Sequence, residues 1–364
     1  MIALILRHFP LASARLLWVY LLLITVAELI TSLASPQLGL LMHALLLVGF
    51  TLHGALGQRT SAGKLALGLT LAPLIRLLSL SLPLLSFPQM AWYPLVSIPL
   101  LIALWLIVRQ LGMPRRSLGL CSGNPVNELL LASIGIVLGV IEYLILQPRP
   151  MVSSLSWHTL LLPSLSLLIF TGFTEEIIFR GLLQALALPA LGRAAFAYVA
   201  LLFAVLHIGY LSLSDVLFVF AVGIVFAYIV HWSGSILGVT LAHGLTNIML
   251  FLIMPYLAQH PAAPLNTFAP WVLWVGIGLS ALAVTLVLVR WIRVRRALLA
   301  GVSPATIRAL RRDHGITYVN LSQRTGIPSR ILAAIEHGQH PLQPEHRAAL
   351  AQALHSLPTT GGER

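Results

Sequence analysis

Two adjacent glutamates and an arginine interrupt one of the most apolar parts of this chain. Glu175 and Glu176 precede Arg180 in "EEIIFR", and the run 161–170 before them has no charged residue. Residues four apart share a helical face, so Glu176 can pair with Arg180. A structural ion pair would explain these two residues but would leave the surplus negative charge of Glu175 unexplained. Charged groups inside apolar segments usually serve a function, and a carboxylate suits acid–base chemistry.

Two later apolar stretches carry the other side chains that could do chemistry. Phe203 and His207 are four apart in "FAVLH", as are His243 and Asn247 in "HGLTN". Taken alone, His207 is explained as a packed residue at a span end. His243 and Asn247 are explained as a hydrogen-bonded pair between helices. Gly244 leaves room for a backbone or a substrate to approach.

Together the three stretches supply the groups that hydrolysis of an amide bond needs. A carboxylate beside a histidine can remove a proton from water. Neutral histidine and asparagine side chains can donate hydrogen bonds to a developing oxyanion. An arginine can hold one carboxylate in place while the other stays free. The sequence therefore predicts a hydrolytic site whose residues come from three separate helices.

The composition indicates that these helices belong to a membrane protein. The 364 residues are 58% hydrophobic and 9% charged, with a mean hydropathy of +0.93, whereas soluble domains carry about 25% charged residues. The single cysteine, Cys121, excludes an intramolecular disulfide and a multi-cysteine metal site. The net charge of +12 is best explained by basic cytoplasmic loops, and nucleic-acid binding is the second explanation.

The apolar runs predict an all-α, polytopic bundle. A helix needs about 20 apolar residues to cross a bilayer. The first run shows no cleavage pattern and is expected to remain in the protein. The sixth extends to about Leu188, which is long for one span and predicts a tilt, a kink or a projecting end. About ten spans are expected, centred on residues 16–35, 37–56, 65–86, 91–108, 127–146, 157–172, 194–208, 214–232, 235–256 and 268–289.

Lysine and arginine are concentrated in alternate loops, which sets the expected orientation. With the N-terminus inside, the opposite loops hold only Arg149. Both termini are then cytoplasmic, in a multi-pass protein of the cell (inner) membrane. The basic residues assigned to the cytoplasm are Arg7, Arg15, Arg59, Lys64, Arg109, Arg115, Arg116, Arg193, Arg290, Arg293, Arg295 and Arg296.

The ordered motifs resemble the CPBP family of intramembrane proteases, also called the CAAX protease or Abi family. "EEIIFR" fits E-E-x-x-x-R, "FAVLH" fits F-x-x-x-H and "HGLTN" fits H-x-x-x-N. The resemblance covers roughly residues 125–255 and implies an intramembrane endopeptidase acting on a membrane-associated protein or peptide. It also implies that Glu175 is the principal catalytic carboxylate, with His207 as its partner in activating water. Glu176 would orient His207 and pair with Arg180.

The same resemblance implies that His243 and Asn247 stabilise the oxyanion. The family has also been described as metal-dependent, and zinc would then be held by Glu175, His207 and His243. No H-E-x-x-H motif is present. A histidine and an asparagine on one helix face favour an oxyanion hole, so the favoured mechanism requires no cofactor.

The composition changes after Arg296, where a small soluble domain is expected. Residues 301–364 contain seven arginines and four acidic residues, a net of +3, and no spanning run. Thr317 is a plausible N-cap and Gly326 a tight turn between two helices. The expected core residues are Ile307, Leu310, Leu321, Leu332, Ile335, Leu350 and Leu354.

This domain resembles the Cro/C1-type (Xre-like) helix-turn-helix family over about 305–355. Its matching residues include Gly315, Ile327, Glu336 and Gly338. The resemblance implies that a helix from about Pro328 enters the major groove, with Ser329 and Arg330 foremost. Tyr318 replaces the usual phosphate-contacting glutamine, and a net of +3 is modest for DNA. DNA and a cytoplasmic protein therefore remain alternative partners.

Two further questions concern a charged residue within a span and the class of function. Arg76, within the third span, is expected to pair with Glu28 or Glu142. Besides a protease, two classes of function stay open: a membrane-tethered DNA-binding regulator and a non-proteolytic immunity or scaffold protein. An Xre-like domain suggests a prokaryote, where prenylated CAAX proteins are unsuited as general substrates. Along the chain we expect five parts: N-terminal helices (1–124), a protease core (125–256), a last span with a basic junction (257–300), the helix-turn-helix domain (301–357) and a tail (358–364).

Overall fold

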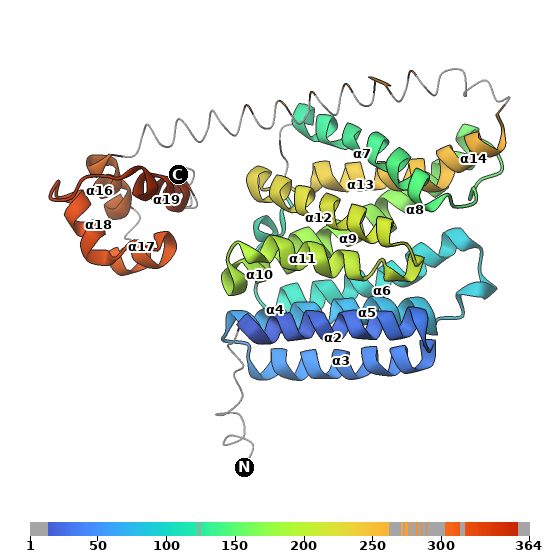
Figure 1. The fold of residues 1–364 in the computed structure, drawn as a ribbon, viewed down its shortest axis with the longest axis horizontal. Helices are drawn as coiled ribbons and strands as arrows, with labels where there is room; N and C mark the ends of the chain where they lie inside the picture. The colour runs from blue at the N-terminus through green and yellow to red at the C-terminus, as the bar shows by residue number, and fades with distance from the viewer. Residues whose placement is uncertain are drawn as a thin grey trace, which may run out of the picture. The chain divides into compact units, whose positions relative to one another are not determined.

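Helices make up all the regular structure in the part of the chain that the computed structural model describes (Figure 1). That part comprises residues 14–121, 123, 125–261, 303–313 and 317–355, with single positions between 271 and 289. The chain divides into two units, Met1–Ala283 and Val284–Arg364. The all-α prediction is confirmed for the described residues.

Eight helices of the described residues are long and apolar enough to cross a membrane. Their positions agree with eight of the predicted spans. The expected span 194–208 forms a shorter apolar segment, made of α11 (Ala194–Val205) and the 3-10 turn η5 (Ile208–Tyr210). The expected span 268–289 and the basic junction after it lie outside the fully described ranges. The eight are α2 (Ala14–Leu33), α3 (Pro36–Leu56), α4–α5 (Ser61–Leu69 and Leu71–Ser81), α6 (Gln89–Gln110), α7 (Pro125–Leu146), α8–α10 (Trp157–Leu191), α12 (Leu213–Ser233) and α13–α14 (Leu237–Gln259).

Hydroxyl side chains begin several of these helices. Ser35 accepts a hydrogen bond from the backbone N–H of Leu38 at the start of α3, and Ser212 accepts one from Asp215 at the start of α12. Such caps satisfy N–H groups that have no partner within the helix. Short 3-10 turns, η1 (Leu84–Ser86) and η2 (Arg115–Leu118), lie in the connections.

The helix that carries the paired glutamates is unusually long and irregular. It runs for 35 residues, about 52 Å at 1.5 Å per residue, so it exceeds a hydrocarbon core of about 30 Å. This agrees with the predicted extension past the glutamates. Wider π-helical turns, which are rare and often mark functional sites, flank the glutamates. The order is α8 (Trp157–Leu167), the π-turn η3 (Leu168–Phe173), α9 (Thr174–Glu176), the π-turn η4 (Ile177–Leu183) and α10 (Gln184–Leu191).

Glycines let α13 pack closely against two neighbours. α13 (Leu237–Ile248) continues as the π-turn η6 (Met249–Ile253) and α14 (Met254–Gln259). A Cβ added at Gly135 of α7 would lie 2.1 Å from the Ala242 carbonyl oxygen. A Cβ at Gly244 would lie 3.0 Å from the Leu168 Cα, so a neighbouring backbone occupies the room expected at this glycine. In Figure 1, α2 and α3 lie at one edge of the bundle, α7 lies near the opposite edge, and α9 to α12 lie between them.

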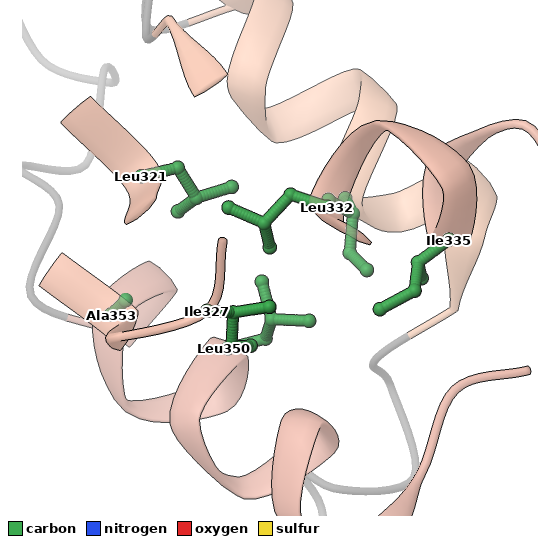
Figure 2. Packing of buried hydrophobic residues seen from close by; sticks show 7 residues of the cluster. Leu321, Ile327, Leu332, Ile335, Leu350 and Ala353 are labelled. Carbon is green, nitrogen blue, oxygen red and sulfur yellow. The ribbon is translucent and has the colours of Figure 1, made fainter. Parts of the chain in front are cut away.

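The second unit is a cluster of short helices around its own apolar core. Thr317 caps α17 by accepting from the Asn320 N–H, and Gly326 ends it with a φ of 72°, as predicted. Gly315 and the side chains of Leu310 and Leu354 lie outside the described part. The helices are α16 (Pro304–Asp313), α17 (Tyr318–Thr325), α18 (Ser329–Glu336) and α19 (Pro344–His355). Figure 2 shows the core, whose residues are Ile307, Leu321, Ile327, Leu332, Ile335, Leu350 and Ala353.

Candidate active site

One cavity of the first unit collects the side chains that the sequence grouped together. It has a volume of about 110 Å³. Apolar residues such as Phe218 and Val222 form much of its remaining wall. Segments more than 60 residues apart thus meet at one place, as a hydrolytic site requires. The six predicted residues in its wall are Glu175, Glu176, Arg180, His207, His243 and Asn247.

Glu176 is the structural member of the glutamate pair. Its side chain is fully buried, and its Oε1 accepts from Arg180 Nη1 at 3.0 Å and from His243 Nδ1 at 2.8 Å. The predicted pair with Arg180 is therefore present. The Arg180 guanidinium also lies 4.4 Å from the centre of the Phe203 ring, where the ring face attracts a cation.

The contact of Glu176 with a histidine differs from the expectation. The family resemblance led us to expect Glu176 to orient His207, but its carboxylate contacts His243 instead. Glu176 lies in α9, directly after the η3 turn that packs against α13, and His207 lies in the turn after α11. The spacing along each helix could not decide between the two histidines, because that choice depends on how the helices pack.

Glu175 is the more accessible carboxylate. About 33% of its side chain is exposed, and its Oε2 lies 3.6 Å from His243 Nε2. His243 therefore faces Glu176 with one ring nitrogen and Glu175 with the other. The Glu176 carboxylate only accepts hydrogen bonds, so His243 Nδ1 carries a hydrogen.

His207 is held by its own segment. Its Nδ1 lies 2.9 Å from the Phe203 carbonyl oxygen, and its ring packs edge-on against the Phe203 ring. A carbonyl only accepts hydrogen bonds, so Nδ1 must carry the hydrogen. The neutral ring then presents Nε2 as a hydrogen-bond acceptor.

Asn247 is oriented by a threonine from the glutamate-bearing helix. Its Nδ2 donates to Thr171 Oγ1 at 2.8 Å, and that hydroxyl in turn donates to the Leu167 carbonyl. A side-chain amide nitrogen carries two hydrogens. One hydrogen of Asn247 remains for a group in the cavity.

The residues expected to hold zinc do not form a metal site in this arrangement. Within the described residues, no three histidine, cysteine, aspartate or glutamate side chains are placed to share a metal ion. Zinc needs three or four such ligands at about 2.0–2.3 Å. Glu175, His207 and His243 do not meet that requirement, so we derive no step through a metal.

Sequence reasoning missed three further residues of the cavity. Tyr93 of α6, Glu142 of α7 and Tyr210 of η5 line it together with the predicted residues. Arg76 was expected to pair with Glu28 or Glu142, and it pairs with Glu28. The available signal was an acidic residue in an apolar helix, which by itself did not specify its neighbours.

Most of the helices that form this cavity match a known protein family. Residues 157–249 match the family described as type II CAAX prenyl endopeptidase Rce1-like. We call this matched part of the chain the Rce1-like domain. The chain is accordingly a multi-pass membrane protease. No curated protein and no solved structure matches the chain.

The Rce1-like domain includes all six predicted cavity residues. It is shorter than the predicted resemblance, which began at residue 125, so α7 and Glu142 lie before its matched range. Tyr93 also lies before it. The cavity is therefore completed by helices outside the Rce1-like domain.

The two residues predicted to contact DNA belong to the second unit and differ in exposure. Arg330 is exposed on α18. The Ser329 hydroxyl donates to the Tyr318 carbonyl at 3.3 Å, so it is partly engaged within the unit. Of the two, Arg330 is the side chain that is free to meet a partner.

Two arginines of the second unit are engaged by one glutamate. Arg311 donates from Nε to Glu336 Oε2 at 2.9 Å and from Nη2 to Oε1 at 3.0 Å. These hydrogen bonds lower the pKa of the Glu336 carboxyl from its ordinary value. Arg308 donates to the Glu336 carbonyl at 2.6 Å. The charge of Arg311 is therefore compensated within the unit, which leaves it less available for binding phosphate.

Proposed function

We propose that this chain is an intramembrane endopeptidase that hydrolyses a peptide bond at or near the membrane without a cofactor. The observation that carries the proposal is one cavity of the described residues, whose wall includes Glu175, His207, His243 and Asn247. The match of the same helices to a protease family adds independent support. The substrate is a membrane-associated protein or peptide.

In the proposed reaction, Glu175 is the general base and His207 helps to position the water. The Nε2 acceptor of His207 and the Glu175 carboxylate each take a hydrogen bond from that water. Glu175 removes a proton as the water oxygen bonds to the substrate carbonyl carbon, and the carbonyl electrons move to its oxygen. The carbon–nitrogen bond then breaks, and the leaving amine takes the proton from Glu175.

His243 and Asn247 stabilise the oxyanion in this proposal. In its protonated form His243 also carries a hydrogen on Nε2, on the side of Glu175, and that N–H donates to the oxyanion. Asn247 has one amide hydrogen that Thr171 does not use. Donors held in place before the reaction stabilise the developing charge without reorganising, and removal of one such donor typically costs about 10²–10³ in kcat.

The test is cleavage of a library of membrane peptides by the reconstituted protein in ¹⁸O-labelled water. We expect new carboxyl termini that carry solvent oxygen, and we expect His207→Ala to abolish most of them. Activity that a zinc chelator does not reduce would support the cofactor-free mechanism, whereas loss that added zinc restores would contradict it. Absence of cleavage products from the unmodified protein would favour an immunity or scaffold role.

We further propose that the second unit is a cytoplasmic helix-turn-helix domain that regulates the protease. The supporting observation is α17, a short turn at Gly326, and α18 with exposed Arg330. The protein would lie in the cell (inner) membrane, with both termini in the cytoplasm. The full chain in nanodiscs should bind duplex DNA with an affinity that falls as salt increases, and Arg330→Ala should weaken it. No binding at low salt would favour a cytoplasmic protein as the partner.

A further inference from the structure

The helices before the Rce1-like domain contain a buried ion pair. Arg76 of α5 donates from Nε to both carboxylate oxygens of Glu28 of α2, at 2.7 and 2.8 Å. The Glu28 side chain is fully buried, and so is His43, whose Nε2 lies 3.6 Å from Glu28 Oε1. Burying charges is costly unless they are paired and hydrogen-bonded. The Arg76–Glu28 pair meets this condition through Nε, which leaves the other guanidinium nitrogens of Arg76 for further contacts.

Arg76 makes that further contact with the Rce1-like domain. Its Nη2 donates to the backbone carbonyl oxygen of Leu206. Leu206 caps the C-terminal end of α11, which ends at Val205. The last carbonyls of a helix have no partner within it, and a cation stabilises the negative end of the helix dipole. A carbonyl without a partner is costly among apolar helices, and Arg76 supplies the hydrogen bond that this carbonyl accepts.

The capped helix end leads directly into His207. The backbone turns there through η5, with φ −90° and ψ −3° at His207 and φ 55° at Leu211. A positive φ at leucine is strained, and such strain persists only where the surroundings hold it. α2 packs against η5. The position of His207 thus depends on helices outside the Rce1-like domain.

We propose that Glu28 and Arg76 are positioning residues that hold the turn carrying His207 in the active site. This inference rests on the proposed function. Arg76 joins the N-terminal helices to the Rce1-like domain, because its guanidinium donates in two directions: Nε donates to Glu28 and Nη2 donates to Leu206. A lysine has only one nitrogen and cannot reproduce this fork. Glu28 compensates the charge and fixes the direction of the guanidinium.

The first test measures amide hydrogen exchange in the full-length protein in detergent. Arg76→Gln and Glu28→Gln should accelerate exchange of a peptide that covers residues 206–211 and leave a peptide at residues 243–247 unchanged. Arg109→Gln is the matched control, because Arg109 is an exposed arginine of α6. Unchanged exchange at 206–211 in both variants would overturn the proposal, whatever happens to activity.

The second test measures kinetics. A misplacement of about 1 Å can cost about 10²-fold, so Arg76→Gln should lower kcat about 10–100-fold with KM within about twofold. Arg76→Lys should recover little of this loss, and Arg109→Gln should match the unmodified enzyme. If Arg76 acts through His207, Arg76→Gln should cost nothing further in a His207→Ala background under single-turnover conditions. Additive losses would overturn the proposal.

These outcomes separate this inference from the proposed function. Full activity of both Glu175→Gln and His207→Ala would refute the proposed function itself. Loss of activity in those two variants, with no coupling between Arg76 and His207 and no change in exchange, would leave the proposed function in place and refute only the positioning role.

Discussion

At the scale of single residues, two neighbouring glutamates take different roles because their surroundings differ. Glu176 is fully buried between Arg180 and His243, whereas about a third of the Glu175 side chain faces open space. The first arrangement stabilises a fold, and the second leaves a carboxylate free to react. The same dipeptide thus provides both the support and the proposed base.

This difference predicts that stability and activity separate between the two positions. Glu176→Ala should lower the free energy of unfolding by about 3–5 kcal/mol, because it leaves the buried Arg180 without its charge partner. Glu175→Ala should change stability by less than about 1 kcal/mol but remove most activity. Thermal unfolding in detergent measures the stability of both variants, and a cleavage assay measures their activity. Equal destabilisation by the two substitutions would contradict the division of roles.

At the scale of elements, the site depends on how closely three helical segments approach. α7, α13 and η3 meet through glycines, and the approach brings His243 and Asn247 to the glutamate-bearing helix. A larger residue at these contacts would push the helices apart. The geometry of the cavity therefore depends on residues with no chemistry of their own.

Gly135→Ala tests this packing. The added Cβ would lie 2.1 Å from the Ala242 carbonyl oxygen, and such overpacking typically costs about 1–3 kcal/mol. Gly49→Ala on α3 is the matched control, because nothing lies within 4 Å of its added Cβ. That variant should be neutral or up to about 1 kcal/mol more stable. Equal melting temperatures for the two variants would contradict the packing argument.

Features of the helices were predictable where the sequence pattern that indicates them lies within a single helix. Long apolar runs predicted the spans that the described residues contain, and i, i+4 spacing predicted the Glu176–Arg180 pair. The partner of Glu176, the short length of α11 and the place of Glu142 in the cavity were not predictable. Each depends on how helices far apart in the sequence pack, and one sequence carries no local signal for that.

At the scale of the whole molecule, the chain combines a membrane protease with a second unit that has its own core. Glu336, buried on α18, connects α16 to α18 through Arg311. The core residues of this unit come from all four of its described helices. Its stability can therefore be measured apart from that of the membrane unit.

Acidification should destabilise this second unit. The pKa of Glu336 is lowered in the folded state, mainly by its hydrogen bond from Arg311. Its contribution is therefore fully present above the unfolded pKa of about 4.3 and is lost as pH falls through the lower folded pKa. Circular dichroism melts of residues 284–364 should show this loss. Glu336→Gln should reduce the pH dependence and lower stability by about 1–3 kcal/mol at neutral pH; an unchanged pH profile would contradict the assignment.

The proposed mechanism depends most on Glu175 as the base of a hydrolytic site in the Rce1-like domain. The most direct measurement is the rate of peptide cleavage by Glu175→Gln in proteoliposomes, because this change keeps the shape of the side chain and removes its basicity. We expect a loss of at least about 100-fold with an unchanged melting temperature. Cleavage at the rate of the unmodified protein would contradict it.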